Sequence, residues 1–157
     1  DKYEYSILIK SDSETAHRLK RHVNYRVLQQ DARAHIISYR GQTSAYAVFE
    51  AGNDFPGLLE KVDMPILLMA EKQGSQLNLS VSDPDLRLAK WNHNMSHMPL
   101  DILYTPAKEQ VVNFTIKGQW KVNAHVDLIN TEVIGNNTTL TLKLQHGMTR
   151  ELKLTKK

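Results

Sequence analysis

The side chains that could do chemistry are scattered through this sequence, and few stand at the spacings that catalysis requires. Serine, histidine and aspartate all occur, but the Gly-x-Ser-x-Gly turn that exposes a nucleophilic serine is absent. A glycine-rich phosphate loop and the His-Glu-x-x-His pair of zinc hydrolases are absent too. The lack of cysteine excludes disulfides, thiol nucleophiles and cysteine-ligated metal sites. We therefore expect no catalytic residue, no metal site and no cofactor in this chain.

His93 and His97 stand at a spacing that could bind a metal, because residues four apart share one face of a helix. Their segment, however, is polar and aperiodic and runs into Pro99. We favour a solvated loop over a metal site.

The densest positive cluster lies near the N-terminus and could attract an acidic polymer. Arginine side chains could bind its sulfates or carboxylates through paired hydrogen bonds. The alternative, which we favour, is a solvated helix face whose apolar stripe is Ala16, Leu19 and Val23. The candidate carbohydrate-binding residues of the cluster are Arg18, Lys20, Arg21 and Arg26.

Two tryptophans could stack on sugar rings, although large aromatic side chains more often pack in a core. Trp120 follows Gly-Gln at the end of a strand pattern, and we expect it in the core. Trp91 begins the long polar segment and joins the basic cluster as a candidate for carbohydrate binding.

Short strands are the elements that would position these side chains. Apolar and polar residues alternate in about ten short runs separated by turn signals such as Gly-Asn-Asn at 135–137. This pattern predicts an all-β fold, an antiparallel β-sandwich. One short N-terminal helix is expected over residues 12–22, with Ser11 and Glu14 as its capping box.

Three segments carry more specific expectations. Residues 55–63 contain Pro56 and Gly57 and are expected to form a loop. Residues 65–70 are continuously apolar after the proline, which predicts a strand covered on both faces. Residues 91–108 should form the long loop of the domain, and no apolar run approaches the roughly 20 residues of a membrane helix.

The length of 157 residues suits one domain, or one domain plus a remnant of another. The net charge of +3 would suit a polyanionic partner, but it lacks the dense basic stripe of a nucleic-acid-binding protein. We therefore expect no nucleic-acid partner. The chain opens inside a strand pattern at Tyr3, which suggests a fragment with sequence missing upstream.

The order of several segments resembles the C-terminal β-sandwich of polysaccharide lyase family 8, which contains chondroitin, hyaluronate and xanthan lyases. The resemblance is carried first by a proline-led apolar strand and a Gln-Gly turn, and then by a second strand that ends in Asp-Pro-Asp-Leu. Upstream segments look most like the branch of broad-specificity chondroitin sulfate ABC lyases. The matching segments are residues 25–28, 34–37, 45–49, 64–73, 77–86, 113–120, 136–142 and 151–154.

The resemblance implies that residues 1–23 are the trailing strand and helix of a central β-domain, and that residues 24–157 are the C-terminal β-sandwich domain. It implies a parent enzyme that cleaves chondroitin or dermatan sulfate by β-elimination in the periplasm or outside a bacterial cell. Its motifs for the catalytic His, Tyr and Arg are absent here, so the fragment alone is expected to be inactive. Expected partners are the central and helical domains of the same enzyme and its acidic glycosaminoglycan substrate. The alternative is an autonomous carbohydrate-binding module for acidic polysaccharides.

Overall fold

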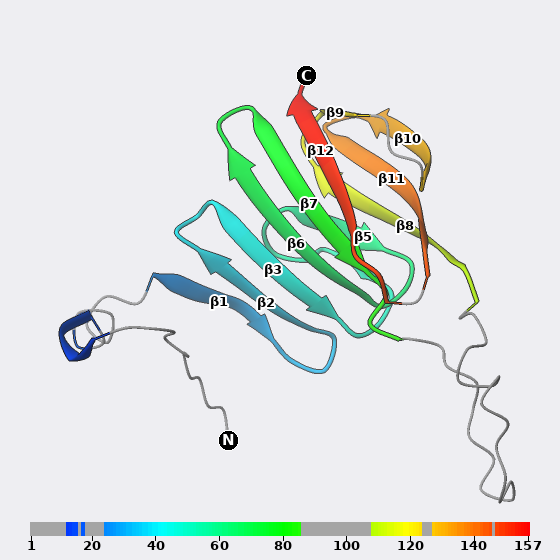
Figure 1. Ribbon diagram of the computed structural model, residues 1–157. Coiled ribbons are helices and arrows are strands. Elements are labelled where there is room, and N and C mark those ends of the chain that lie inside the picture. Colours follow the sequence, from blue (N-terminus) through cyan, green and yellow to red (C-terminus); the bar gives the residue numbers. More distant parts are fainter. Residues whose placement is uncertain (1–11, 16, 18–23, 86–107, 124–126, 146) are drawn as a thin grey trace, which may run out of the picture.

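The computed structural model describes residues 12–15, 17, 24–85, 108–123, 127–145 and 147–157. Two antiparallel sheets form a sandwich (Figure 1), which confirms the predicted all-β class. Sheet A has the order β1 (Tyr25–Gln30), β2 (Ala34–Tyr39), β3 (Thr43–Val48), β6 (Ile66–Gln73), β7 (Gln76–Ser82), β12 (Arg150–Lys156) and β9 (Trp120–Val122). Sheet B has the order β10 (Leu128–Ile134), β11 (Asn137–Leu144), β8 (Gln110–Lys117), β5 (Leu59–Val62) and β4 (Gly52–Asn53).

The short N-terminal helix is present at residues 13–15 and 17. Its described cap is Asp12, whose Oδ1 accepts the backbone N–H of Thr15 at 2.7 Å. That hydrogen bond lowers the pKa of the Asp12 carboxyl. The predicted cap Ser11, the predicted end of the helix near residue 22 and the strand pattern before residue 11 lie outside the described residues.

The core lies between the two sheets and follows from strict alternation along the strands. In the first five residues of β6 and throughout β11, for example, every second residue faces inward and is buried. The buried side chains form one cluster that draws on both sheets, including Tyr46, Phe55 and Phe114. Burial of this apolar surface holds the sandwich together, at roughly 25 cal/mol per Å² removed from water.

Trp120 lies in this core at 4% exposure, as the sequence predicts. Its Nε1 donates to the Lys117 carbonyl at 2.9 Å, and its backbone N–H donates to Thr138 Oγ1 at 2.9 Å. Gly118, at φ 103°, makes this turn possible because a Cβ there would stand 2.6 Å from Trp120 Nε1. The indole therefore fixes the crossing of the chain from β8 in sheet B to β9 in sheet A.

Tyr46 forms a second tie between the sheets. It lies on β3 in sheet A, and its hydroxyl accepts the backbone N–H of Leu58 at 2.7 Å, just before β5 in sheet B. Gly57 permits this approach, since its φ is 83° and a Cβ would stand 2.6 Å from the Tyr46 hydroxyl. The buried phenol thus satisfies a loop N–H that would otherwise lack a partner.

Two local expectations are wrong. The expected loop at 55–63 contains β5, whose Leu59 and Val62 both face the core although they are three residues apart. A β-bulge between Leu59 and Lys61 causes this irregular spacing. The sequence therefore lacks the apolar–polar alternation by which the other strands were predicted. The expected cover on both faces of the strand after Pro65 is also missing in this structure, because Leu67 is 43% and Met69 is 51% exposed.

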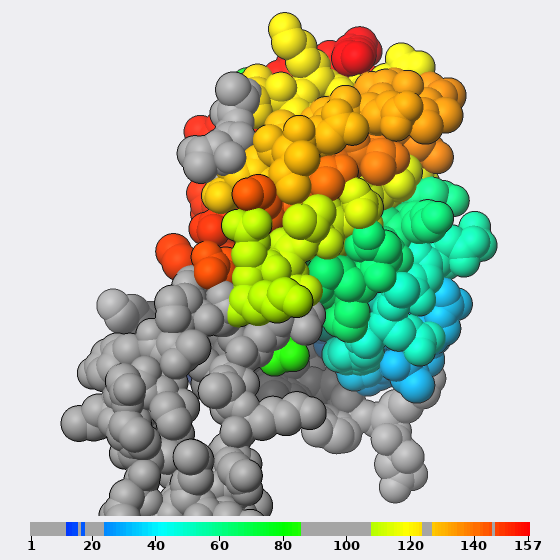
Figure 2. Space-filling view, turned by 90° about the vertical axis from the view of Figure 1, so that its right-hand side faces the viewer, coloured from blue at the N-terminus to red at the C-terminus, as the bar shows by residue number. Residues whose placement is uncertain are grey.

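The two sheets have different outer faces. On sheet B, threonines and charged residues bond to one another, as in the 2.9 Å contact between the hydroxyls of Thr115 and Thr139. Figure 2 shows the side of the molecule where β11 (orange), β8 (yellow) and β5 (green) lie side by side. On sheet A the outer face includes large apolar side chains on β1, β2 and β6: Val27, Ile37, Leu67 and Met69.

Candidate functional site

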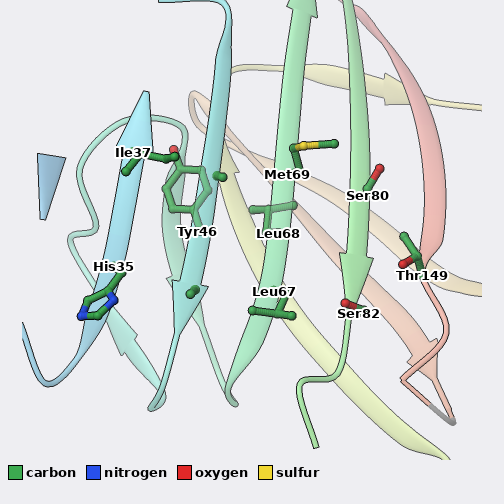
Figure 3. Close-up of a pocket in the computed structure, with 11 residues that line it drawn as sticks. His35, Ile37, Tyr46, Leu67, Leu68, Met69, Ser80, Ser82 and Thr149 are labelled. Carbon is green, nitrogen blue, oxygen red and sulfur yellow. The ribbon is translucent and has the colours of Figure 1, made fainter. Parts of the chain in front are cut away.

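Two hollows are candidates for function. The first, the outer groove, has a volume of about 410 Å³ and lies on the outer face of sheet A (Figure 3). The second, the end cleft, has a volume of about 320 Å³ and opens between the two sheets at the β2–β3 and β6–β7 turns. Both are built by regular strands, so the register of the sheets fixes which side chains line them.

The outer groove is defined by two cross-strand rows of side chains. One row runs from Ile37 through Ala45 and Met69 to Ser80, and each member pairs with the next across the ladder. The second row runs one step further along the strands, and it consists of His35, Ala47, Leu67 and Ser82. The lining is completed by Thr149 and the strand backbones.

Small side chains on β3 form the floor of the groove. Ala45 and Ala47 stand between the larger residues of β2 and those of β6, with which they pair across the ladder. Neighbouring strands are about 4.8 Å apart, so the walls on β2 and β6 lie roughly 10 Å from each other. The result is a trough along β3 with one wall at Ile37 and the other at Met69.

The groove has little charge. The described lining residues include no lysine, arginine, aspartate or glutamate. The His35 ring meets the exposed Phe49 ring edge to face, with centroids 5.1 Å apart. Such a surface offers van der Waals contact and apolar area, but no countercharge for a sulfate or carboxylate.

The end cleft is different because hydroxyls and ammonium groups line it. Ser38 and Ser44 face each other across β2 and β3, and Gln42, Lys72 and Lys117 add polar groups. Lys117 Nζ already lies 3.2 Å from Glu60 Oε2 and donates to the Phe55 carbonyl at 3.3 Å. Lys72 has no ion pair among the described residues and is the available cation of the cleft.

Only part of the predicted carbohydrate site can be placed. Arg26 lies on β1, is exposed, and pairs with Ser38 across the ladder, so it shares the sheet face of the end cleft. Arg18, Lys20, Arg21 and Trp91 lie outside the described residues, and so do His93 and His97. A joint site of Arg26 with the rest of the basic cluster therefore stays a prediction.

The described residues form no cluster of three or more His, Asp or Glu able to hold a metal. The buried carboxylate of Asp83 is used locally, since its Oδ1 accepts the backbone N–H of Asp85 at 2.9 Å. Among these residues no helix is long and apolar enough to cross a bilayer.

Both hollows were missed by reasoning from the sequence. The groove had one signal, the apolar run of residues 65–70 beside the Ala-x-Ala pattern of residues 45–47. The cleft had no signal, because its residues come from five separate segments and meet only through the β-ladder pairing and the Tyr46 contact.

Comparison with known proteins identifies homologues of this chain. The chain is 33% identical over 135 residues to a chondroitin sulfate ABC exolyase of Bacteroides thetaiotaomicron, a match covering 76% of this chain. It is 27% identical over 131 residues to a chondroitin sulfate ABC endolyase of Proteus vulgaris, covering 83% of this chain. The chain is a homologue of chondroitin sulfate ABC lyases. The resemblance seen in the sequence is thereby confirmed.

The homology concerns a small part of those lyases. The matched stretches span 13% and 12% of the two relatives, respectively. No family model matches the sequence.

Solved structures of lyases share the fold. A Streptomyces coelicolor chondroitin AC lyase, solved in complex with chondroitin sulphate, matches with a TM-score of 0.65 at 15% identity, over 94% of this chain and 17% of that one. A Paenibacillus xanthan lyase matches with a TM-score of 0.60 at 13% identity, over 96% of this chain and 13% of that one. At these identities the likeness concerns the sandwich architecture.

Proposed function

We propose that this chain is the non-catalytic C-terminal domain of a larger glycosaminoglycan lyase that cleaves chondroitin or dermatan sulfate by β-elimination. The observation that carries the proposal is the homology to 12–13% of the length of chondroitin sulfate ABC lyases. In this role residues 24–157 support the catalytic parts of the same polypeptide and border the substrate cleft. Such an enzyme would work in the periplasm or outside a bacterial cell.

The chemistry explains why the rest of the polypeptide is needed. In β-elimination a base removes the C5 proton of the uronate, the C4–C5 double bond forms, and the C4–O bond breaks. The leaving oxygen takes up a proton from an acid, and the uronate carboxylate needs its charge neutralised. Two of the described side chains that could act as a base or an acid already have packing contacts: His35 packs on Phe49, and the Tyr46 hydroxyl accepts a hydrogen bond from the loop before β5. Both contacts support structural roles for these two groups.

The test compares two proteins on chondroitin sulfate, using the ultraviolet absorbance of the unsaturated uronate product. The full-length polypeptide that contains these residues should produce the signal, and the 157-residue chain alone should give a flat trace. Product formation by the 157-residue chain would overturn the non-catalytic role. A full-length polypeptide that cleaves no glycosaminoglycan would overturn the lyase assignment.

Binding of an acidic polysaccharide is a second candidate function, and the end cleft favours it. Lys72, Arg26 and the two hydroxyls of Ser38 and Ser44 share one face of sheet A there. A sulfate or carboxylate could accept hydrogen bonds from these groups. The site would make the chain a carbohydrate-binding module rather than a purely structural one.

A chondroitin sulfate column at low ionic strength tests this second function, because screening is weakest there. Lys72→Ala should elute at lower salt than Lys143→Ala, which removes one equal charge from the outer face of sheet B. Failure of the wild-type chain to bind, or equal elution of the two variants, would sink the cleft as a polysaccharide site.

A further inference from the structure

We propose that the outer groove of sheet A is a docking surface, and that its occupant is an apolar ridge from another domain of the same lyase polypeptide. The inference rests on the proposed function, because it needs a larger parent chain. It goes further by naming which face of the sandwich meets that chain. The argument uses the composition of the face, its shape and the amount of parent chain that lies outside this domain.

The composition of the face is that of an interface. Ile37 at 42%, Leu67 at 43% and Met69 at 51% exposure are neighbours across β2, β3 and β6. Val27 extends the same row on β1, because it pairs with Ile37. Contiguous apolar patches of this kind are uncommon on isolated soluble domains and mark interaction surfaces.

The pattern within β6 gives an independent argument. A strand with one face in water normally alternates apolar and polar residues, whereas a strand buried on both faces is apolar throughout. Residues 66–70 read Ile-Leu-Leu-Met-Ala, yet only Ile66, Leu68 and Ala70 are buried within this domain. A second cover over Leu67 and Met69 resolves the mismatch between the sequence and the structure.

The shape of the face admits a protein ridge. Ala45 and Ala47 leave a trough along β3 between walls roughly 10 Å apart. That width matches an α-helix with its side chains, or one row of side chains from a second sheet packed face to face. A flat apolar face would lack walls on the two sides of such a ridge and would not favour it over another shape.

The lack of charge in the groove lining and the small share of the relatives' length that this chain covers both bear on which occupant the groove has. Among the described residues, the groove lining has no lysine or arginine to bind an acidic glycosaminoglycan, which disfavours a sulfated chain as its occupant. The chain covers only 12–13% of its curated relatives, so most of such a polypeptide would lie outside these residues. Interfaces between domains of one polypeptide form at high effective concentration, so a small apolar contact can be enough to hold them.

Two methionines of the chain provide an internal test. Met69 in the groove is 51% exposed, and Met148, before β12, is 56% exposed. In the full-length polypeptide, dilute peroxide should oxidise Met148 to its sulfoxide, while Met69 reacts about tenfold more slowly, as expected for a docking equilibrium of about 1.4 kcal/mol. Peptide mass spectrometry measures both rates in one sample.

The outcomes separate the possible occupants. Equal oxidation of the two methionines in a polypeptide that still cleaves chondroitin sulfate would overturn the docking proposal and leave the proposed function intact. Protection of Met69 that disappears on dilution would instead indicate a second copy of the chain. Protection that appears only after chondroitin sulfate is added would indicate a sugar, and both results would also overturn the proposal.

A pair of matched variants in the full-length polypeptide provides a second measurement. Leu67→Lys with Met69→Lys should release the domain, so that a protease cuts ahead of Tyr25 faster than in the wild type. Val111→Lys with Ile129→Lys places the same charges on the sheet B strands β8 and β10, where the original side chains are 48% and 49% exposed. Equal cutting of the two variants would contradict a role for the groove.

Discussion

The outer faces of the two sheets differ in how their side chains are satisfied. On sheet B, Asn113 donates its backbone N–H and its amide to the two oxygens of Asp63, at 2.9 and 2.6 Å, and its own Oδ1 accepts from Thr141. On sheet A, Ile37, Leu67 and Met69 have no such network and face outward. Sheet B also exposes apolar side chains, such as Val111 at 48% and Ile129 at 49%, but polar residues of its outer face bond to one another. On sheet A the exposed apolar side chains are neighbours in the cross-strand rows of the outer groove.

The largest difference in the free energy of unfolding should be between alanine substitutions on the inner and on the outer face of β6. Leu68→Ala, at a side chain only 2% exposed, should lower the free energy of unfolding by about 3 kcal/mol, because it leaves a cavity. Leu67→Ala, one residue away on the open face, should cost under about 1 kcal/mol in the 157-residue chain. Urea unfolding measures both. Equal losses would mean that the outer face of sheet A is already packed.

The polar network of sheet B should show the next largest effect. Asp63→Ala removes the acceptors of both Asn113 donors and should cost about 1–2 kcal/mol. Asp63→Asn keeps one oxygen acceptor and should retain part of that stability. If both variants unfold like the wild type in urea, the sheet B face is not held by this network.

The carboxylate of Asp31, in the β1–β2 turn of sheet A, should make the stability of the domain depend on pH. Backbone N–H groups of Ala34 and then Arg33 donate to Asp31 in the β1–β2 turn and lower the pKa of its carboxyl below 3.8. Because the folded state favours the ionised form, this stabilisation is complete above pH 3.8 and is lost as the pH falls through the lowered folded pKa.

The measurement is the loss of stability between about pH 6 and about pH 3, followed by urea unfolding. Asp31→Asn should reduce that loss relative to the wild type. The β10–β11 turn of sheet B is formed by Gly135 and Asn136 and has no carboxylate, so Asn136→Ala should leave the pH dependence unchanged. A wild-type slope in Asp31→Asn would rule out this role of the turn.

The smallest effect should come from the surface ion pairs. Lys143 Nζ lies 3.2 Å from Glu109 Oε1 on sheet B, and Arg33 Nε lies 3.5 Å from Glu50 Oε1 beside sheet A. Lys143→Met and Glu50→Gln should each change the free energy of unfolding by less than about 0.5 kcal/mol, since these pairs are solvated. A larger change in only one of them would mean that charge, as well as apolar surface, distinguishes the two sheets.

The sequence was informative where alternation is regular. The strands around Leu77–Val81 and Leu140–Leu144, the turn at 135–137 and the buried Trp120 were predicted because one face of each strand meets the core. The strand at Leu59–Val62 was missed, because a bulge breaks its alternation. The end cleft could not be predicted from the sequence, because strand pairing brings together residues that are far apart in the chain, such as Ser38 and Lys72.

The wrong expectation for residues 65–70 is the most instructive one. A continuous apolar run predicts two covered faces, and the structure supplies one. A strand that is apolar throughout is typical of a strand covered on both faces. The exposed Leu67 and Met69 are therefore the basis of the proposed docking surface.

The edges of the two sheets decide how an uncovered chain can associate. In sheet A, the edge strand β1 has a bulge between Val27 and Gln29, and the opposite edge strand β9 has three residues. In sheet B, β10 has a bulge between Leu128 and Asn130, and β4 has two residues. Bulged or very short edges are poor templates for adding a strand. A freed domain would therefore associate reversibly through its open face, and its edges would resist growth into fibrils.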